Sequence, residues 1–483
     1  ADGKTLIAGM SYQKDSGGNL TRAYLFVERV NVDGTLDSSF GTAGIAHIDT
    51  NATGVVEVPN SLIIQSDGKI IIAGYSKNSS GADFLLARLN SNGSLDTSFN
   101  TSGKIINLAS TGNNYAFSLA IQADGKYVIV GSSNYGLSNE DIRIIRYNIN
   151  GSIDGTFGSS GIVTTDLGAA DEGRSVIVQP DGKILVAGKS GSDATLIRFN
   201  SNGSLDYSFG AFGVVSQDFG GSSDQISSLL LQPDGRIIAA GVGSAGKITL
   251  ARFYRDGRID TTFGSSGIFA TTIGGDIGGA VLDSNGKILI LGSKGDYVAR
   301  VSSNGSLDAT FASSGIYTTS LGTTFSQVGS RLALQSNGEI VTVGVSSSTS
   351  KIWIEKNYPD GHVDNAFGST TFVSAASYAE RASAIILEGG VSIFDQELSS
   401  VSNYVGNFNG ASITLLRNGG ASSDDVFSAG GSLSFSGSDV VVSGTTIGSF
   451  TNTGGTLAIT FNSSATQALV NTALQGLAYS NSS

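Results

Sequence analysis

The residues whose chemistry is most evident are cations that recur at one position of a repeating pattern. Each lies near the end of an apolar run, as Arg198 does, and an Asp follows it eight residues later. The cations are Arg29, Arg88, Arg146, Arg198, Arg252, Arg300 and Lys356, and the acids are Asp37, Asp96, Asp154, Asp206, Asp260, Asp308 and Asp364. A ring of such cations could grip an anionic ligand. Because the pair recurs in every copy, we favour an ion pair within each copy, with the Arg fork bidentate on the carboxylate.

Acidic residues also gather in the segments that link one copy to the next. They are Asp166, Asp171 and Glu172, then Asp218 and Asp224, then Asp276. These links should lie on one face, where carboxylates and backbone carbonyls could bind calcium, a hard ion that prefers oxygen ligands. None of them has the spacing of a calcium-binding loop, and a solvated acidic rim is the favoured interpretation. The metal-binding residues therefore stay unassigned.

The sequence offers little for catalysis. Its two histidines, His47 and His362, fall in different copies, and it has no cysteine. A His-based general base, a thiolate nucleophile or a Cys metal site therefore lacks its residues. His47 alternates with apolar residues, which is typical of a strand, and the one Trp, Trp353, is interpreted as packing rather than as a sugar platform. We predict no catalytic and no cofactor-binding residue, and hence no enzyme.

The elements that position these residues follow from an internal repeat. In one copy, an apolar run ends at Val178, Pro180-Asp181-Gly182 makes a tight turn, and further runs at 184–187, 196–199 and 213–215 complete a four-stranded meander. The turn glycines are Gly3, Gly68, Gly125, Gly182, Gly235, Gly286 and Gly338, and the Phe that comes three residues after each recurrent Asp is Phe40, Phe99, Phe157, Phe209, Phe263, Phe311 or Phe367. Both counts give seven copies, and the Phe is predicted to anchor the core.

Four-stranded units repeated seven times predict an all-β fold, a seven-bladed β-propeller with its blades set around a channel. An open solenoid is the alternative. The first copy begins at its hairpin turn and lacks a first strand, while the run that ends in Ile385-Ile386-Leu387 is a first strand with no copy to follow. We expect these two ends to complete one blade and close the ring, which removes edge strands. Completion by a neighbouring molecule would instead build a filament.

Two signatures of the repeat, Gln-x-Asp-Gly-Lys-Ile-x-x-Ala-Gly and Asn-Gly-Ser-Leu-Asp-x-x-Phe-Gly, resemble the delta-60 repeats of large bacterial extracellular proteins. The resemblance covers residues 1–387 and implies a β-propeller of unassigned biochemical function. In the seventh copy Glu339 replaces the Lys of the turn, and Gly361-His362-Val363-Asp364 replaces Gly-Ser-Leu-Asp. We therefore expect the last blade to be irregular.

The repeat stops near residue 389, so we expect domains at 1–388 and 389–483. Strand candidates in the second are 413–416, 432–435, 440–442, 445–450 and 456–461. Ser464 is a candidate N-cap for one helix, whose apolar face would consist of Leu469, Val470, Ala473, Leu474 and Leu477. This β-rich, cadherin-like or Ig-like segment resembles modules that adjoin cadherin-like repeats in giant bacterial adhesins. Asp424-Asp425 could bind calcium at a module junction, but exposed turn carboxylates are the favoured interpretation.

Composition limits the function. The chain has 483 residues and a net charge of −12, which argues against nucleic-acid binding, and no apolar run is long enough to span a membrane. The abrupt start at Ala1 and end at Ser483 suggest an excerpt of a longer chain. We expect a non-enzymatic structural or adhesive protein, secreted or on the bacterial surface, whose rigid propeller belongs to a surface, matrix or filament-forming chain. Expected partners are copies of itself, neighbouring modules, glycans or surface proteins. No cofactor is required, although calcium is an option. The alternatives are a lectin-like propeller and a carbohydrate-active enzyme.

Overall fold

The computed structural model describes residues 2–14, 20–48, 55–106, 112–243, 246–275, 277–292, 297–312, 314–319, 331–345, 352–364, 367, 385–386, 408–410, 412–416, 425–454 and 456–481. The chain divides into two compact units, Ala1–Phe367 and Gly368–Ser483. Residues 387–407 lie outside the described part, so the boundary expected at 388/389 stays a prediction.

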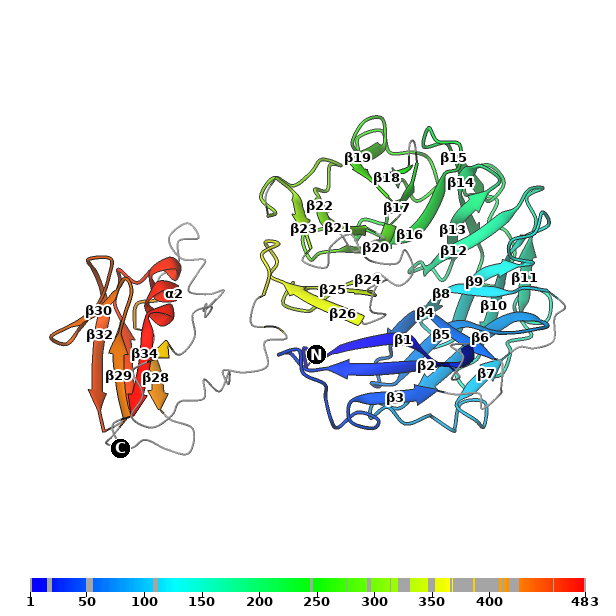
Figure 1. The fold of residues 1–483 in the computed structure, drawn as a ribbon. Helices are drawn as coiled ribbons and strands as arrows, with labels where there is room; N and C mark the ends of the chain where they lie inside the picture. The colour runs from blue at the N-terminus through cyan, green and yellow to red at the C-terminus, as the bar shows by residue number, and fades with distance from the viewer. Residues whose placement is uncertain are drawn as a thin grey trace. The chain divides into compact units, whose positions relative to one another are not determined.

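The first unit is a series of small antiparallel sheets that follow one another around a ring (Figure 1). Their strands, grouped by sheet, are β1 (Thr5–Lys14), β2 (Leu20–Val30) and β3 (Ile45–Ile48); β4 (Val56–Ile64), β5 (Ile70–Asn78), β6 (Gly81–Leu89) and β7 (Lys104–Ile106); β8 (Tyr115–Ile121), β9 (Tyr127–Ser133), β10 (Asp141–Tyr147) and β11 (Ile162–Thr165); β12 (Asp171–Val178), β13 (Ile184–Ser190), β14 (Asp193–Phe199) and β15 (Val214–Gln217); β16 (Gln225–Leu231), β17 (Ile237–Val242), β18 (Lys247–Phe253) and β19 (Ile268–Gly274); β20 (Ile277–Leu282), β21 (Ile288–Gly292), β22 (Tyr297–Val301) and β23 (Ile316–Thr318); and β24 (Arg331–Leu334), β25 (Ile340–Val345) and β26 (Ile352–Asn357). One parallel pair, Ala23 with Val56, joins the first two sheets. The predicted all-β, propeller-type fold of four-stranded units is confirmed.

The hairpin turn of each copy forms for the reason that the sequence suggests. In the turn between β12 and β13, Gly182 has a φ of 81°, a conformation that Gly adopts without steric cost. The N–H of Gln179 donates to the carbonyl of Lys183 at 2.8 Å, and the Lys183 N–H donates to the Asp181 carboxylate at 3.1 Å. The turn therefore fixes the register of the two strands, which places Lys183 beside the turn that follows the third strand.

Neighbouring sheets pack through both faces. Along β13, Ile184 and Val186 join the core shared with the sheet before, whereas Leu185 and Ala187 join the core shared with the sheet after. This follows from the alternation of side chains along a strand. A strand buried on both faces has no polar side, which explains the continuous apolar runs of the repeat.

The recurrent Phe is the core anchor that the repeat predicts. It is fully buried in six copies, as Phe40, Phe99, Phe157, Phe209, Phe263 and Phe311. The seventh, Phe367, is half-buried. Burial of a Phe side chain stabilises a fold by roughly 1.5–3 kcal/mol, so these rings contribute a large part of the stability of each copy.

The Gly that ends the Ala-Gly signature is required by a close approach of two backbones. A Cβ on Gly188 would collide with the carbonyl oxygen of Glu172 on the neighbouring strand β12. At this level the pairing of β12 with β13 shifts between Gly173 and Ser175, as in a β-bulge. The bulge bends the first strand toward the second, and only Gly leaves room for it.

The closure predicted for the ring is wrong in its detail. Ile385 and Ile386 form β27 (Ile385–Ile386), which pairs with Tyr479 and Ala478 of the second unit and not with the first blade. The unpaired backbone N–H and C=O groups of any open sheet edge can bind a short apolar strand. The resemblance of Ile385-Ile386 to a first strand therefore does not determine which edge it pairs with. Among the described residues β1 pairs with β2 alone. The ring closes instead through side chains of the last copy that bind backbone carbonyls of the first.

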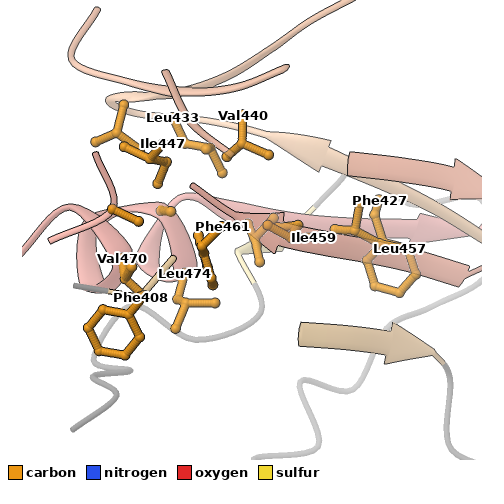
Figure 2. Packing of buried hydrophobic residues seen from close by; sticks show 14 residues of the cluster. Phe408, Phe427, Leu433, Val440, Ile447, Leu457, Ile459, Phe461, Val470 and Leu474 are labelled. Carbon is orange, nitrogen blue, oxygen red and sulfur yellow. The ribbon is translucent and has the colours of Figure 1, made fainter. Parts of the chain in front are cut away.

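The second unit has its own core, built by two sheets and a helix. Its other elements are β28 (Ser412–Leu416), β29 (Asp425–Ala429), β30 (Leu433–Ser436), β31 (Asp439–Val442), β32 (Thr445–Thr453), β33 (Thr456–Phe461), α2 (Gln467–Gln475) and β34 (Leu477–Asn481). The five predicted strands are present, and β29 and β34 are additional. Figure 2 shows Val470 and Leu474 of α2 beside Phe461 and Ile459 of β33.

The start of the helix differs from the prediction. Thr466, not Ser464, is the N-cap, and its hydroxyl accepts the N–H of Leu469 at 3.4 Å. Ser464 instead donates its N–H to Asn462. The predicted face is confirmed for Val470, Ala473 and Leu474, which are buried, while Leu477 belongs to β34. No described helix has the length and apolar character to cross a membrane.

Candidate functional site

Each sheet of the first unit has two ends with different residues. The hairpin turn and the loop after the third strand lie at one end, here called the turn face. The loop between the second and third strands and the link to the next sheet lie at the opposite end, here called the loop face. This follows from the antiparallel order of each meander. The recurrent cations and acids belong to the turn face.

In the fourth copy the cation and the acid form the predicted ion pair. Arg198 Nε donates to Asp206 Oδ2 at 2.6 Å, and Lys183 Nζ reaches the same oxygen at 2.8 Å. The other oxygen, Oδ1, accepts the N–H and hydroxyl of Ser208 at 3.2 and 2.7 Å. The bidentate fork expected for Arg is wrong, because Nη2 turns to the Ser208 hydroxyl at 3.3 Å instead. We call Arg198, Asp206, Lys183 and Ser208, with their equivalents in other copies, the clamp.

The clamp also reaches the next copy. Arg198 Nη1 donates to the carbonyl of Arg255, and the N–H of Gly210 donates to the carbonyl of Asp256 at 2.8 Å. Both acceptors lie in the turn after the third strand of the next copy. The guanidinium therefore has partners at Nε, Nη1 and Nη2, all within the protein. This arrangement favours the interpretation of the cation as a structural residue over an anion-binding ring.

Packing and hydrogen bonding keep the clamp charged. The Arg198 guanidinium carbon lies 4.6 Å from the ring centroid of Phe209, a favourable cation–π distance. Burial alone would raise the pKa of the Asp206 carboxyl, but hydrogen bonds from Lys183, Ser208 and Arg198 hold this pKa well below its usual range. The acid is thus ionised at neutral pH, and the guanidinium has a charged partner there.

The contact with the next copy recurs in all seven copies, and the last one returns to the first. The acceptor carbonyls, in order from the first cation to the seventh, are those of Ser91, Ile149, Ser201, Arg255, Ser303, Pro359 and Val32. A second contact between the last and first copies is Gln335 Nε2 to the carbonyl of Gly3, at 2.7 Å. The array therefore closes on itself through side chains that bind backbone carbonyls.

The seventh copy is irregular, as expected, because an acid, Glu339, stands where most other copies have Lys in the turn. Lys356 stands where the other copies have Arg, and its Nζ lies 3.0 Å from Asp364 and 3.2 Å from Glu339. Here one cation serves two carboxylates, whereas the fourth copy has two cations on one carboxylate. The carbonyl of Val32 lies 3.3 Å from the Lys356 Nζ. The ammonium of Lys356 therefore neutralises both Glu339 and Asp364 in this copy.

The acidic links, on the loop face, separate into two groups. Asp166 and Asp171 come together, and Asp141, which the sequence reasoning missed, joins them. Glu172 instead forms ion pairs with Arg174 at 2.5 Å and with Lys189 at 2.7 Å. In the next link the carboxylates of Asp218 and Asp224 accept the N–H groups of Gly220 and Phe219, respectively. Asp276 and Asp424 lie outside the described residues, and Asp425 begins β29.

An aromatic cluster that the sequence reasoning missed also lies on the loop face. Ring centroids are 4.3 Å apart for Tyr75 and Tyr115, 4.7 Å for Tyr115 and Tyr135, and 5.6 Å for Phe117 and Tyr135. Arg174 covers Phe117 with its guanidinium carbon 4.4 Å from the centroid. All four rings are partly exposed. Phe117 is the unpaired residue of the bulge in β8 and Tyr115 lies two residues before it. The equivalent residues of β12 are Arg174 and Glu172, so a comparison of these positions between copies could have revealed the aromatic pair.

The remaining candidates stay apart. His47 is an exposed residue of strand β3, with its ring 5.3 Å from that of Tyr24, which confirms the strand interpretation. His362 lies in an exposed turn beside Asp360, at 3.1 Å. Trp353 lies on β26, and its side chain is outside the described part of the structure. The structure does not bring these residues together.

The clamp segments are also what known sequences share with this chain. A family described as a β-propeller domain of unknown function, DUF5122, matches residues 65–99, 122–157, 179–209, 232–263 and 284–311. Each matched segment ends at the recurrent Phe that lies three residues after the Asp of a clamp. The chain is a β-propeller repeat protein. No curated protein matches its sequence.

Solved structures of other proteins resemble the propeller at low identity. A streptogramin B lyase has a TM-score of 0.43 at 10% identity, over 73% of this chain and 97% of the lyase chain. The PQQ-bound aldose sugar dehydrogenase of Streptomyces coelicolor has a TM-score of 0.38 at 15% identity, over 62% and 93%. A protein of unknown function from Bacteroides caccae has a TM-score of 0.37 at 13% identity, over 60% and 92%.

Proposed function

We propose that the chain is a non-enzymatic structural or adhesive protein, secreted or carried on a bacterial surface, in which a rigid propeller is displayed within a longer surface, matrix or filament-forming chain. The likeness of its repeats to delta-60 repeats, and of its second unit to modules of giant adhesins, supports this location. A charged fraction of only 14% suits a stable extracellular surface, and the absence of cysteine is compatible with that location. The proposed partners are copies of itself, neighbouring modules, glycans or surface proteins.

The clamp is the observation that carries the proposal. The charged residues that recur in the repeat hold neighbouring copies together, with Arg198 as the example, whose three guanidinium nitrogens all bind groups of the protein. Residues on the loop face differ from copy to copy, as Tyr115 and Glu172 do at one equivalent position. A propeller whose turn face is rigid and whose loop face differs between copies is better suited to the display of variable loops than to catalysis.

The location can be tested on intact cells of the organism that makes the protein. An antibody against residues 55–312 should label unpermeabilised cells or the culture medium, and added protease should remove the signal. A cytoplasmic enzyme of the same cells serves as the control and should resist the protease. Protection of the propeller in intact cells, with digestion only after lysis, would contradict the proposal.

Light scattering and negative-stain microscopy of the purified chain then separate display from assembly. A monomer whose ring is closed by Lys356 and Gln335 favours display within a longer chain. Fibres would favour strand exchange between subunits, because β1 keeps one edge without a paired strand among the described residues. Each outcome specifies a different form of the same structural function.

The aromatic cluster favours a second candidate, a lectin-like propeller. Partly exposed Tyr and Phe rings offer flat apolar surfaces, and the Tyr hydroxyl groups offer polar partners, a combination suited to sugar rings. A glycan array with the whole chain should then give bound glycans, and Tyr115→Ala should abolish binding. Tyr207→Ala is the matched control, because Tyr207 is 71% exposed in a turn on the turn face. An array without signal would reject this candidate.

Two glutamates near the cluster bear on the third candidate, cleavage of a carbohydrate. Burial, with the nearby charge of Glu172, raises the pKa of Glu140. Burial would also raise the pKa of Glu172, but Arg174 and Lys189 lower it overall. Separated pKa values of this kind can divide acid and base roles. Both oxygens of Glu172 are already engaged by cations, however, so we place binding ahead of catalysis.

A further inference from the structure

Three carboxylates meet on the loop face where the third sheet joins the fourth. Asp141 begins β10, Asp166 follows β11, and Asp171 begins β12 of the next sheet (Figure 1). Each offers one oxygen, and the three oxygens lie within 4.8 Å of one another. Asp166 is exposed, Asp141 is partly buried and Asp171 is fully buried.

This arrangement is unfavourable without a positive charge. The register of β10 and β11 pairs Ile142 with Thr165, which sets Asp141 and Asp166 opposite each other at the end of the ladder. Like charges directly opposite destabilise a sheet. The ion pairs of the described residues include none with any of these three carboxylates.

Asp171 gives an independent indication of a missing partner. Its Oδ2 accepts the N–H of Leu167 at 2.6 Å, but its Oδ1 is buried and has no hydrogen-bond partner within the described part of the chain. A buried carboxylate oxygen without a partner carries a large desolvation cost. The backbone holds the group in place, because the Asp171 N–H donates to the carbonyl of Glu140 at 2.8 Å.

We propose that Asp141, Asp166 and Asp171 form a binding site for a hard divalent cation, calcium. Two oxygens that both lie about 2.4 Å from one ion are at most about 4.8 Å apart, and the three oxygens meet this limit. All donors are oxygen, which suits calcium, and its irregular coordination accepts ligands from three strands better than the strict octahedron of magnesium does. Exposed Asp166 provides the entry path, and water completes the shell.

The next copy provides a natural comparison. Asp193 begins β14 at the position that Asp141 holds in β10. Its two oxygens accept the hydroxyls of Ser192 at 3.2 Å and Ser216 at 3.1 Å. Among the described residues, only the group with Asp141 meets the distance limit for three carboxylates. Asp193 therefore has hydroxyl partners and is the matched control. Asp224, which holds the position of Asp171 in this copy, also has a buried Oδ1 without a hydrogen-bond partner in the described part of the chain, but it belongs to no group of three carboxylates there.

The test is calcium titration of the metal-stripped whole chain by isothermal calorimetry, together with thermal melting of the same samples. The wild-type chain should bind one calcium ion more than Asp166→Asn or Asp141→Asn, and Asp193→Asn should keep the wild-type stoichiometry. In chelator, the two site variants should melt at or above the wild-type temperature, because each removes a repelling charge. In calcium the order should reverse, because the ion stabilises the chain that binds it.

Asp141 is partly buried, so loss of calcium binding in Asp141→Asn could also come from misfolding. Asp166 is exposed, so Asp166→Asn should leave the fold intact and separates the two explanations. A wild-type chain that binds no calcium at millimolar concentration would overturn the proposal. Equal stoichiometry in wild type and Asp166→Asn would also overturn it, since the ion would then bind elsewhere. The outcome is independent of where the protein is located or whether it binds glycans.

Discussion

Replacement of Arg198 by Met is the most direct test of the clamp. Met keeps an unbranched apolar stem of similar length, so the packing against Phe209 is largely preserved while the charge and its donors are lost. The substitution removes the contact of Nε with Asp206 at 2.6 Å and that of Nη2 with Ser208 at 3.3 Å, as well as the bond to the Arg255 carbonyl in the next copy.

The magnitude follows from burial. The side chains of Arg198 and Asp206 are 7% and 8% exposed, and removal of one partner from a buried ion pair typically costs about 3–5 kcal/mol. Asp206 keeps Lys183 and Ser208 as partners, so we expect the lower end, about 3 kcal/mol. Lys183 is 28% exposed, and the corresponding Lys183→Met should cost only about 1 kcal/mol. The expected order, with Arg198 well ahead of Lys183, does not depend on either value.

Denaturant unfolding followed by Trp fluorescence measures this difference. The chain's one Trp, Trp353, lies on β26 of the first unit, so its signal reports on the propeller. Near-equal losses for Arg198→Met and Lys183→Met would refute the assignment of the guanidinium as the main tie between copies. So would a loss below about 1 kcal/mol for Arg198→Met, which is the level of a surface ion pair.

Three further changes test the other physical arguments. Burial opposes ionisation of Asp260, yet Thr262, Tyr254 and Arg252 lower its pKa to about 2. The contribution of Asp260 to the stability of the propeller is therefore complete above the unfolded pKa of about 3.9 and is lost as pH falls toward 2. The melting temperature of the propeller should fall over that window, and a constant melting temperature would contradict this. Gly188→Ala should destabilise the propeller by more than about 1 kcal/mol through the clash with Glu172, whereas Gly155→Ala, which meets no atom within 4 Å, should change its melting little. Thr466→Ala should lower the stability of the second unit by about 1 kcal/mol and Ser464→Ala by less, as measured by thermal melting; the reverse order would restore Ser464 as the N-cap.

Most of the fold was predictable from the repeat, because the same turn glycine, core Phe and buried cation recur in each copy. Gly182 marked the hairpin, Phe209 the core anchor and Arg198 the buried cation that needs a partner, and all three hold in the structure. The partner acid was also predictable, since Asp206 recurs with the cation. The bidentate geometry was not, because the competing hydroxyl of Ser208 and the carbonyl of the next copy are set by the packing of sheets.

Single contacts that do not recur were harder to predict. Ile385 and Ile386 have the pattern of a first strand, but pattern alone does not choose between two open edges, and the structure pairs them with β34. Asp141 was missed because it stands at the start of a strand, 25 residues before Asp166 in the sequence, and only the register of β10 and β11 brings them together. Tyr75 and Tyr115 were missed for a different reason, since they lie on different sheets and only the packing of those sheets brings their rings together.

The two faces of the propeller explain where function can vary. On the turn face, a change at Arg198 disturbs its own copy and the next, since the guanidinium binds Asp206 and the Arg255 carbonyl. On the loop face, Tyr115 and Glu172 occupy equivalent positions with unrelated chemistry while both first strands keep their bulge. Substitution is therefore costly at one face and tolerated at the other. Both the aromatic cluster and the three carboxylates lie on the tolerant face, which is where a ligand specific to this chain should be sought.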